Sequence, residues 1–163
     1  MSRGGRAASS GLGNIWPSRF ERRKQMHPKA SVWRRSHKSR DPLDRVLGYL
    51  DLCKRLLKGE VAEFSCLTST IVQKVYGTHA GMREACDASI SGHVAPLEAD
   101  IAEAMELYAV RGKWSAQSLA LYTHAVLQGS FILAKAKGGP EVAATSIDHL
   151  RRYIELLFKP AEH

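Results

Sequence analysis

The chain has 163 residues, 44% of them hydrophobic, which is enough for one sizeable core and typical of a single domain. It contains no run of roughly 18 apolar residues and no apolar block near its start, which excludes a membrane-spanning helix and a secretory signal. The formal charge of +8 is uneven: residues 1–40 hold 11 Lys or Arg against one Glu (+10), and residues 41–163 hold 13 against 15 acids (−2). We therefore expect a soluble, cytoplasmic protein with a basic leader.

Residues 1–40 mix Gly, Ser, Pro and Arg without a sustained helical period, so we expect a leader that does not fold alone. Its segments ERRK (21–24) and WRRSHKSR (33–40) place aromatic residues among cations, as in arms that bind nucleic acid in a salt-dependent way. A solvated tail or a translation artefact is the simpler interpretation. An Arg-rich, acid-poor start also matches an organellar transit peptide.

The folded domain is predicted to begin at Asp41, a suitable N-cap that precedes Pro42 and apolar residues at helical spacing. This first helix is expected to stop at Gly59. A second helix is predicted over residues 64–79. A long third helix is predicted from about Met82 to Tyr108, kinked or split near His93 by Pro96.

Two further helices are predicted after Ser115, which can serve as an N-cap. Gly138 suits the end of the first of them and Pro140 the first residue of the second, so the pair should form an antiparallel hairpin. Both helices are apolar over a wider arc than one core requires. Such an arc is what a dimer interface needs, because one side packs inward and the other meets a partner.

These last helices, LYTHAVLQGSFILAKAKGGPEVAATSIDHLRRYIELLF, closely resemble the end of the effector-binding domain of the TetR/AcrR family of bacterial transcriptional regulators. The segment DPLDRVLGYLDLCKRLLKGE resembles an earlier helix of that domain. The resemblance covers residues 41–163 and implies an all-α fold in which the last two helices form a four-helix bundle with those of a second subunit. We therefore predict a homodimer whose interface contains Leu119, Tyr122, Val126, Gly129, Leu133, Ile147, Leu150, Ile154 and Leu157.

The resemblance also implies a small, apolar or aromatic effector, bound in a cavity between the middle helices. By position, the candidate ligand-binding residues are Phe64, Thr68, Tyr76, His93, Met105, Tyr122 and Gln128. For each of them a simple place in the core is the alternative interpretation.

The family also has an N-terminal helix-turn-helix of about fifty residues that reads DNA in the major groove. The 40 residues before Asp41 contain no pair of amphipathic helices, so DNA binding stays uncertain. Two explanations remain open: a truncated or mis-started reading frame, which we favour, or a basic arm in place of the DNA reader. The alternative function is a helical scaffold whose basic arm binds nucleic acid without sequence preference.

The sequence predicts neither an enzyme nor a cofactor, because it has no nucleophile elbow, no phosphate-binding glycine loop and no HExxH motif. His79, Cys86 and His93 recur every seven residues, but on a helix neighbours would lie about 10 Å apart. One zinc ion, with bonds of about 2.0 to 2.3 Å, cannot bridge such a distance, so no metal site is expected.

Overall fold

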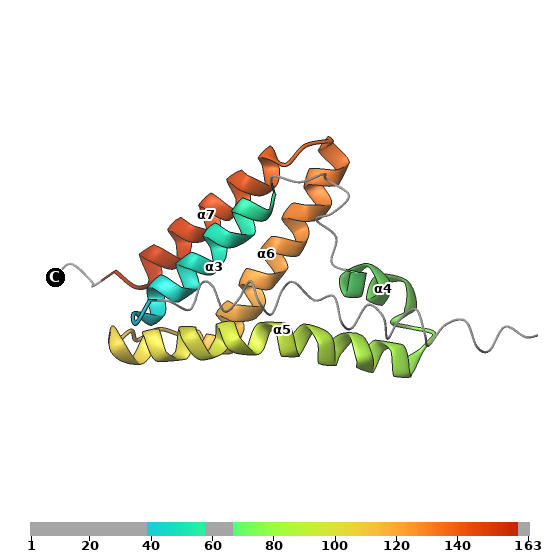
Figure 1. Ribbon diagram of the computed structural model, residues 1–163. Coiled ribbons are helices and arrows are strands. Elements are labelled where there is room, and N and C mark those ends of the chain that lie inside the picture. The colour runs from blue at the N-terminus through green and yellow to red at the C-terminus, as the bar shows by residue number, and fades with distance from the viewer. Residues whose placement is uncertain (1–38, 58–66, 160–163) are drawn as a thin grey trace, which may run out of the picture. The chain divides into compact units, whose positions relative to one another are not determined.

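The computed structural model describes residues 39–57 and 67–159, which belong to one compact unit, Ser36–His163. Every regular element in these ranges is an α-helix, which confirms the predicted all-α class. The elements are α3 (Pro42–Leu56), α4 (Leu67–Val75), α5 (Ala80–Leu107), α6 (Ala116–Lys137) and α7 (Glu141–Leu157) (Figure 1). None of these helices combines the length and the apolar character that crossing a membrane would require. Residues 1–38 of the predicted leader and the predicted stop at Gly59 lie outside the described residues.

The start of α3 follows directly from local chemistry. The Asp41 carboxylate accepts hydrogen bonds from the backbone N–H groups of Leu43, at 2.8 Å, and Asp44, at 3.2 Å. These are two of the N–H groups that have no partner inside a helix. Pro42 follows in the first turn, where its missing N–H costs nothing. The predicted N-cap is therefore confirmed.

Helix α5 runs without interruption through Pro96, so the predicted split near His93 does not occur. A proline removes one backbone hydrogen bond and crowds the preceding turn, at a cost of about 3 kcal/mol. Val94, Leu97 and Ile101, with at most 4% exposure each, bury the same side of the helix on both sides of that position. Burying each of these side chains contributes roughly 1.5 to 3 kcal/mol, which together exceeds the cost of the proline.

Helices α6 and α7 form the predicted antiparallel hairpin. Ser115 caps α6 by accepting a bond from the Ser118 N–H, and the Ser118 hydroxyl in turn accepts one from the Ser115 N–H. Gly138 ends α6 with φ of 72°, a left-handed conformation that glycine adopts without steric cost. Pro140 is predicted as the first residue of α7; in the structure it is the N-cap, and the helix begins one residue later, at Glu141.

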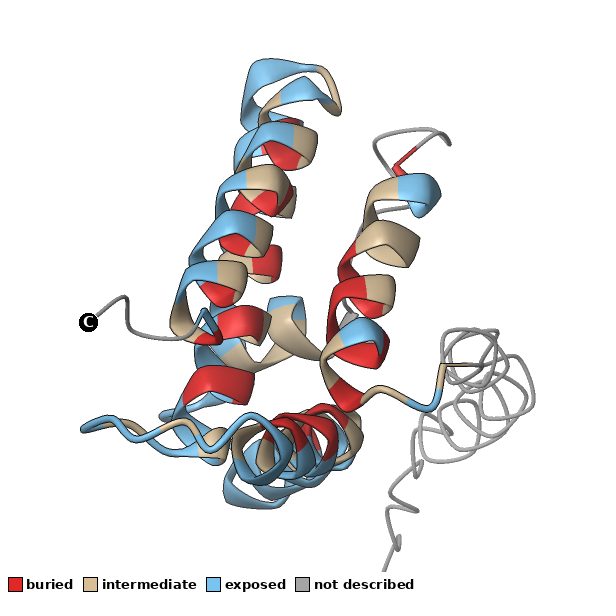
Figure 2. Ribbon diagram, turned by 90° about the vertical axis from the view of Figure 1, so that its left-hand side faces the viewer, coloured by how far each residue is buried: buried red, intermediate tan, exposed pale blue. Residues whose placement is uncertain are grey.

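The helices pack around one core. Helix α6 packs against α5 and α7, α3 packs against α5 and α7, and α4 packs mainly against α5. Figure 2 shows the buried residues on the sides of the helices that are turned towards one another. The largest fully buried side chains come from α3, α5 and α7 together with Thr123 of α6: Leu50, Ile101, Ile147, Ile154, Val46, Thr123 and Pro42.

Candidate functional site

Helix α6 carries an uncharged surface. From Ser115 to Ala134 the sequence contains no Asp, Glu, Lys or Arg. Four large apolar side chains of this helix are nevertheless about half exposed: Leu121 (48%), Tyr122 (49%), Ile132 (54%) and Leu133 (47%). The outward side of a helix that meets only water normally carries charged residues. The outer side of α6 therefore has the composition of a surface that is covered.

The exposed residues of α6 have a regular arrangement. At 3.6 residues per turn, Leu121 and Ile132 fall in one row, and Tyr122 and Leu133 fall in a second, parallel row. The line between the two rows holds only small residues, namely Ala125, Gly129 and Ala136. A Cβ atom built on Gly129 would meet nothing within 4 Å. The line is therefore open, and another helix could approach it closely.

Helix α7 extends this surface next to α6. Tyr153 is 44% exposed and its ring packs edge-on against the Tyr122 ring, with centroids 5.5 Å apart. Leu156 is 62% exposed, and His149 lies on the same side of the helix. A shallow groove of about 410 Å³ runs between the two helices, lined by Tyr122, Val126, Ser146, His149, Leu150 and Tyr153. We call this surface the α6–α7 face: Leu121, Tyr122, Ala125, Val126, Gly129, Ile132, Leu133, His149, Tyr153 and Leu156.

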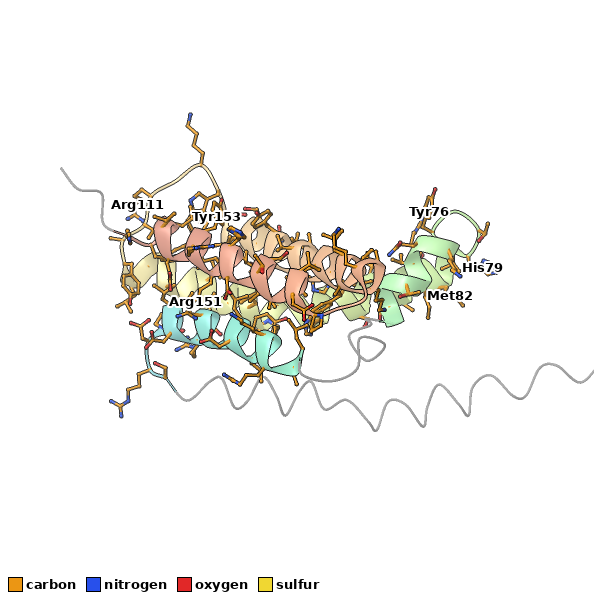
Figure 3. The ribbon with its side chains drawn as sticks, turned by 90° about the horizontal axis from the view of Figure 1, so that it is seen from above. Tyr76, His79, Met82, Arg111, Arg151 and Tyr153 are labelled. Carbon is orange, nitrogen blue, oxygen red and sulfur yellow. The ribbon has the colours of Figure 1, made fainter. Side chains whose placement is uncertain are left out.

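Two charged residues on the other side of α7, Asp148 and Arg151, hold α3. Lys54 Nζ lies 2.6 Å from Asp148 Oδ1, and Arg151 Nη1 lies 2.9 Å from Asp51 Oδ1. Figure 3 shows Arg151 on the side of α7 next to α3 and Tyr153 away from it. The polar side of α7 is thus used within the subunit, while its apolar stripe beside α6 is left on the outside.

The structure places the predicted dimer-interface residues partly on the α6–α7 face and partly inside the subunit. Tyr122, Val126, Gly129 and Leu133 belong to the α6–α7 face, and Leu157 is half-buried. Four others pack inside the subunit, with exposures of 0 to 4%, and this corrects their assignment as interface residues: Leu119, Ile147, Leu150 and Ile154. Apolar spacing marks both an inner and an outer row on the same helix, and only the neighbouring helices decide which row is covered.

The surface residues that the predicted interface missed are Leu121, Ile132, Tyr153 and Leu156. Their signal in the sequence is the absence of charge on α6 combined with large apolar residues beyond the inner row. That signal indicates a second covered side, although it does not say which row is the outer one.

A polar cluster lies in the core where α3, α5 and α6 meet. The Tyr49 hydroxyl is 3.1 Å from His93 Nε2, and the His93 and His124 rings pack edge to face with centroids 5.6 Å apart. Beside His124, Thr123 is fully buried, and its Oγ1 has no hydrogen-bond partner in the part of the chain that the structure describes. A hydroxyl left in this state costs about 1 to 3 kcal/mol. The core of the described residues also buries Arg45, Asp100 and Ser130, so this cluster is one of several polar features in a largely apolar core.

The predicted ligand-binding residues do not gather at one place. His93 belongs to the polar cluster, Tyr122 to the α6–α7 face, and Tyr76 is 68% exposed after the end of α4. The Thr68 hydroxyl is 3.3 Å from that of Ser89, Met105 and Gln128 are half-buried, and Phe64 lies outside the described residues. Sequence reasoning missed Tyr49, Thr123 and His124, because contacts between α3, α5 and α6 join residues that are far apart in the chain.

No group of three or more His, Cys, Asp or Glu side chains that could hold a metal ion occurs within residues 39–57 and 67–159. No protein-family model, no curated protein and no solved structure matches the chain.

Proposed function

We propose that residues 41–163 are the effector-binding and dimerisation domain of a TetR-like transcriptional regulator, and that two copies pair through the α6–α7 face. The observation that carries this proposal is the uncharged outer side of α6, continued by the exposed stripe of α7. The sequence segment that resembles the TetR/AcrR family most closely forms these two helices.

The area of the face agrees with a subunit interface. Six of its side chains are 44 to 62% exposed: Leu121, Tyr122, Ile132, Leu133, Tyr153 and Leu156. At roughly 200 Å² for each large side chain, they leave about 600 Å² of apolar surface in water. This is at the upper end of the patches found on monomers, about 300 to 600 Å², and approaches the roughly 800 Å² that each partner contributes to a standard interface.

The shape of the face also favours a second copy of the chain. A twofold pair uses the same patch on both subunits, so the patch must contain both projecting and receding parts. The α6–α7 face has both: the rows of Leu121 with Ile132 and Tyr122 with Leu133 project, while the line through Gly129 and the groove beside Tyr153 recede.

The experiment is the oligomeric state of the full chain by analytical ultracentrifugation, for the wild type and for Gly129→Arg. The new side chain has open space in the single subunit, so it should leave the fold intact, yet it places a cation in the centre of the face. We expect a dimeric wild type and a dissociation constant raised at least a hundredfold, because an unpaired buried charge costs about 3 to 5 kcal/mol.

The matched control is Gly92→Arg, a second helical glycine with nothing within 4 Å of a built Cβ, located on α5 rather than on the α6–α7 face. This variant should remain dimeric. A monomeric wild type, or a Gly129→Arg dimer as tight as that of Gly92→Arg, would refute the proposed pairing.

The effector part of the proposal is supported by the polar contacts of Tyr49, His93 and His124 and, separately, by the buried hydroxyl of Thr123. Polar groups inside an apolar wall are what orients a small ligand in a protein cavity. A thermal-shift screen of small aromatic compounds tests it, since a ligand at a hundred times its dissociation constant stabilises the fold by about 2.7 kcal/mol. A true effector should lose this shift in His93→Gln, while a shift that survives the substitution places binding elsewhere. The alternative of a nucleic-acid arm concerns residues 1–40, of which residues 1–38 lie outside the described part.

A further inference from the structure

His149 is the imidazole of the α6–α7 face. It lies on α7, is exposed, and lines the groove between Tyr122 and Tyr153. The guanidinium of Arg152, one helical turn away, brings Nη2 to 3.1 Å from His149 Nδ1. A guanidinium can only donate hydrogen bonds, so Nδ1 must be the acceptor and the proton of the ring must be on Nε2. The contact therefore requires a neutral His149.

Among the described residues, those that line the groove with His149 include no carboxylate. From α6, the residue facing it is Tyr122, and that helix has no charged residue between Ser115 and Ala134. From α7, the neighbours are Ser146, Tyr153 and the cationic Arg152. The carboxylates of α7 that make ion pairs are engaged elsewhere: Asp148 pairs with Lys54 and Glu155 with Arg151. A proton on His149 would thus add a second positive charge beside Arg152 with no carboxylate on the face to offset it.

We propose that pairing of two copies through the α6–α7 face is weakened by acid, with His149 as the group whose protonation separates them. This rests on the proposed function, because it concerns the regulation of the same interface. In the separate subunit, His149 is exposed and water can solvate its charge. In a pair, the groove beside Tyr153 is covered, and a charge held there loses its water while facing Arg152.

The direction of the effect follows from linkage. The separate subunits can take up protons that the pair excludes, so lowering the pH shifts the equilibrium towards separate subunits. Histidine is the side chain whose charge ordinarily changes between about pH 5 and 8, so the equilibrium is compared near the two ends of that range. A twofold interface contains His149 twice, so both copies act in the same direction and the dissociation constant should rise as the pH falls.

The test is the dissociation constant of the full chain by analytical ultracentrifugation at about pH 7.5 and about pH 5.5. Three proteins are compared: the wild type, His149→Gln and His79→Gln. Glutamine keeps a polar side chain without a proton to gain. His79 precedes α5 at its junction with α4, away from the α6–α7 face, and is also exposed (Figure 3). A circular dichroism spectrum at the lower pH establishes that the helices persist.

We expect the wild type and His79→Gln to weaken at least tenfold at the lower pH, and His149→Gln to change less than threefold. A wild-type dimer of equal affinity at both values overturns the acid response and leaves the dimer itself in place. A His149→Gln dimer that weakens as much as the wild type also overturns it, because another group then titrates. A wild type that is monomeric at the higher pH overturns both this inference and the proposed pairing.

Discussion

The ion pair between Arg45 and Asp100 should be the strongest polar contact between α3 and α5. Arg45 Nε donates to Asp100 Oδ1 at 2.8 Å, and the two side chains are only 10% and 6% exposed. Arg45 also donates to Glu103, whose side chain is 58% exposed, and to the carbonyl of Arg40 at 3.2 Å. Burial opposes the charge of Arg45, but the carboxylates of Asp100 and Glu103 outweigh it and raise the pKa of the guanidinium. The cation therefore stays charged in the core and depends on its partners.

Removing the buried carboxylate should be costly for this reason. In Asp100→Ala the charge of Arg45 remains almost fully buried without its buried partner, a change that typically costs about 3 to 5 kcal/mol. Because Glu103 remains, we expect a loss of about 3 kcal/mol in the free energy of unfolding. Glu103→Ala is the matched control, since it removes the exposed partner of the same guanidinium and should cost about 0 to 1 kcal/mol.

Urea unfolding followed by far-ultraviolet circular dichroism measures both losses, given that a domain of this kind is stable by about 5 to 15 kcal/mol. The difference between the two variants is the decisive quantity. If Asp100→Ala loses no more stability than Glu103→Ala, then burial does not control the strength of this network and the reasoning is refuted.

Two further predictions concern the ends of α5 and α6 and the acid stability of the domain. Ala109 follows the C-cap of α5 and has a φ of 51°, a left-handed conformation in which an L side chain is strained. Ala109→Gly should therefore stabilise the domain by about 0.5 to 1 kcal/mol in the same urea assay. Gly138→Ala imposes the same strain at the end of α6, where a Cβ meets no other atom, and should destabilise the domain by about 1 kcal/mol. A change of the same sign in the free energy of unfolding of both variants would contradict this account. The hydrogen bond from the Tyr108 hydroxyl lowers the pKa of Asp41; desolvation opposes this effect, and the backbone N–H groups of Leu43 and Asp44 add to it. The Asp41 carboxylate therefore stabilises the fold above about pH 4, and this contribution is lost as the pH falls through its lower folded pKa. Tyr108→Phe should therefore make the acid unfolding curve shallower below about pH 4, and an unchanged curve would show that the contact does not form in solution.

Where the fold depends on neighbours in sequence, the residues themselves were sufficient to predict it. Asp41, Ser115 and Gly138 act on backbone groups within a few positions of themselves, so their chemistry is complete before any tertiary contact forms. The wide apolar arcs of α6 and α7 are also visible in composition and spacing, and the exposed Leu121, Ile132 and Leu156 show that they extend beyond the core of the subunit.

Tertiary structure decided which of two apolar rows faces inward, and this reversed the assignment of Leu119, Ile147, Leu150 and Ile154. Spacing records the period of a helix but not its rotation about its axis, which is set by the helices packed against it. The same packing keeps α5 whole through Pro96. It also joins Arg45 to Asp100, which are 55 positions apart in the chain, and His93 to His124. Such contacts have no local signature, because their energy exists only once the chain has brought the two surfaces together.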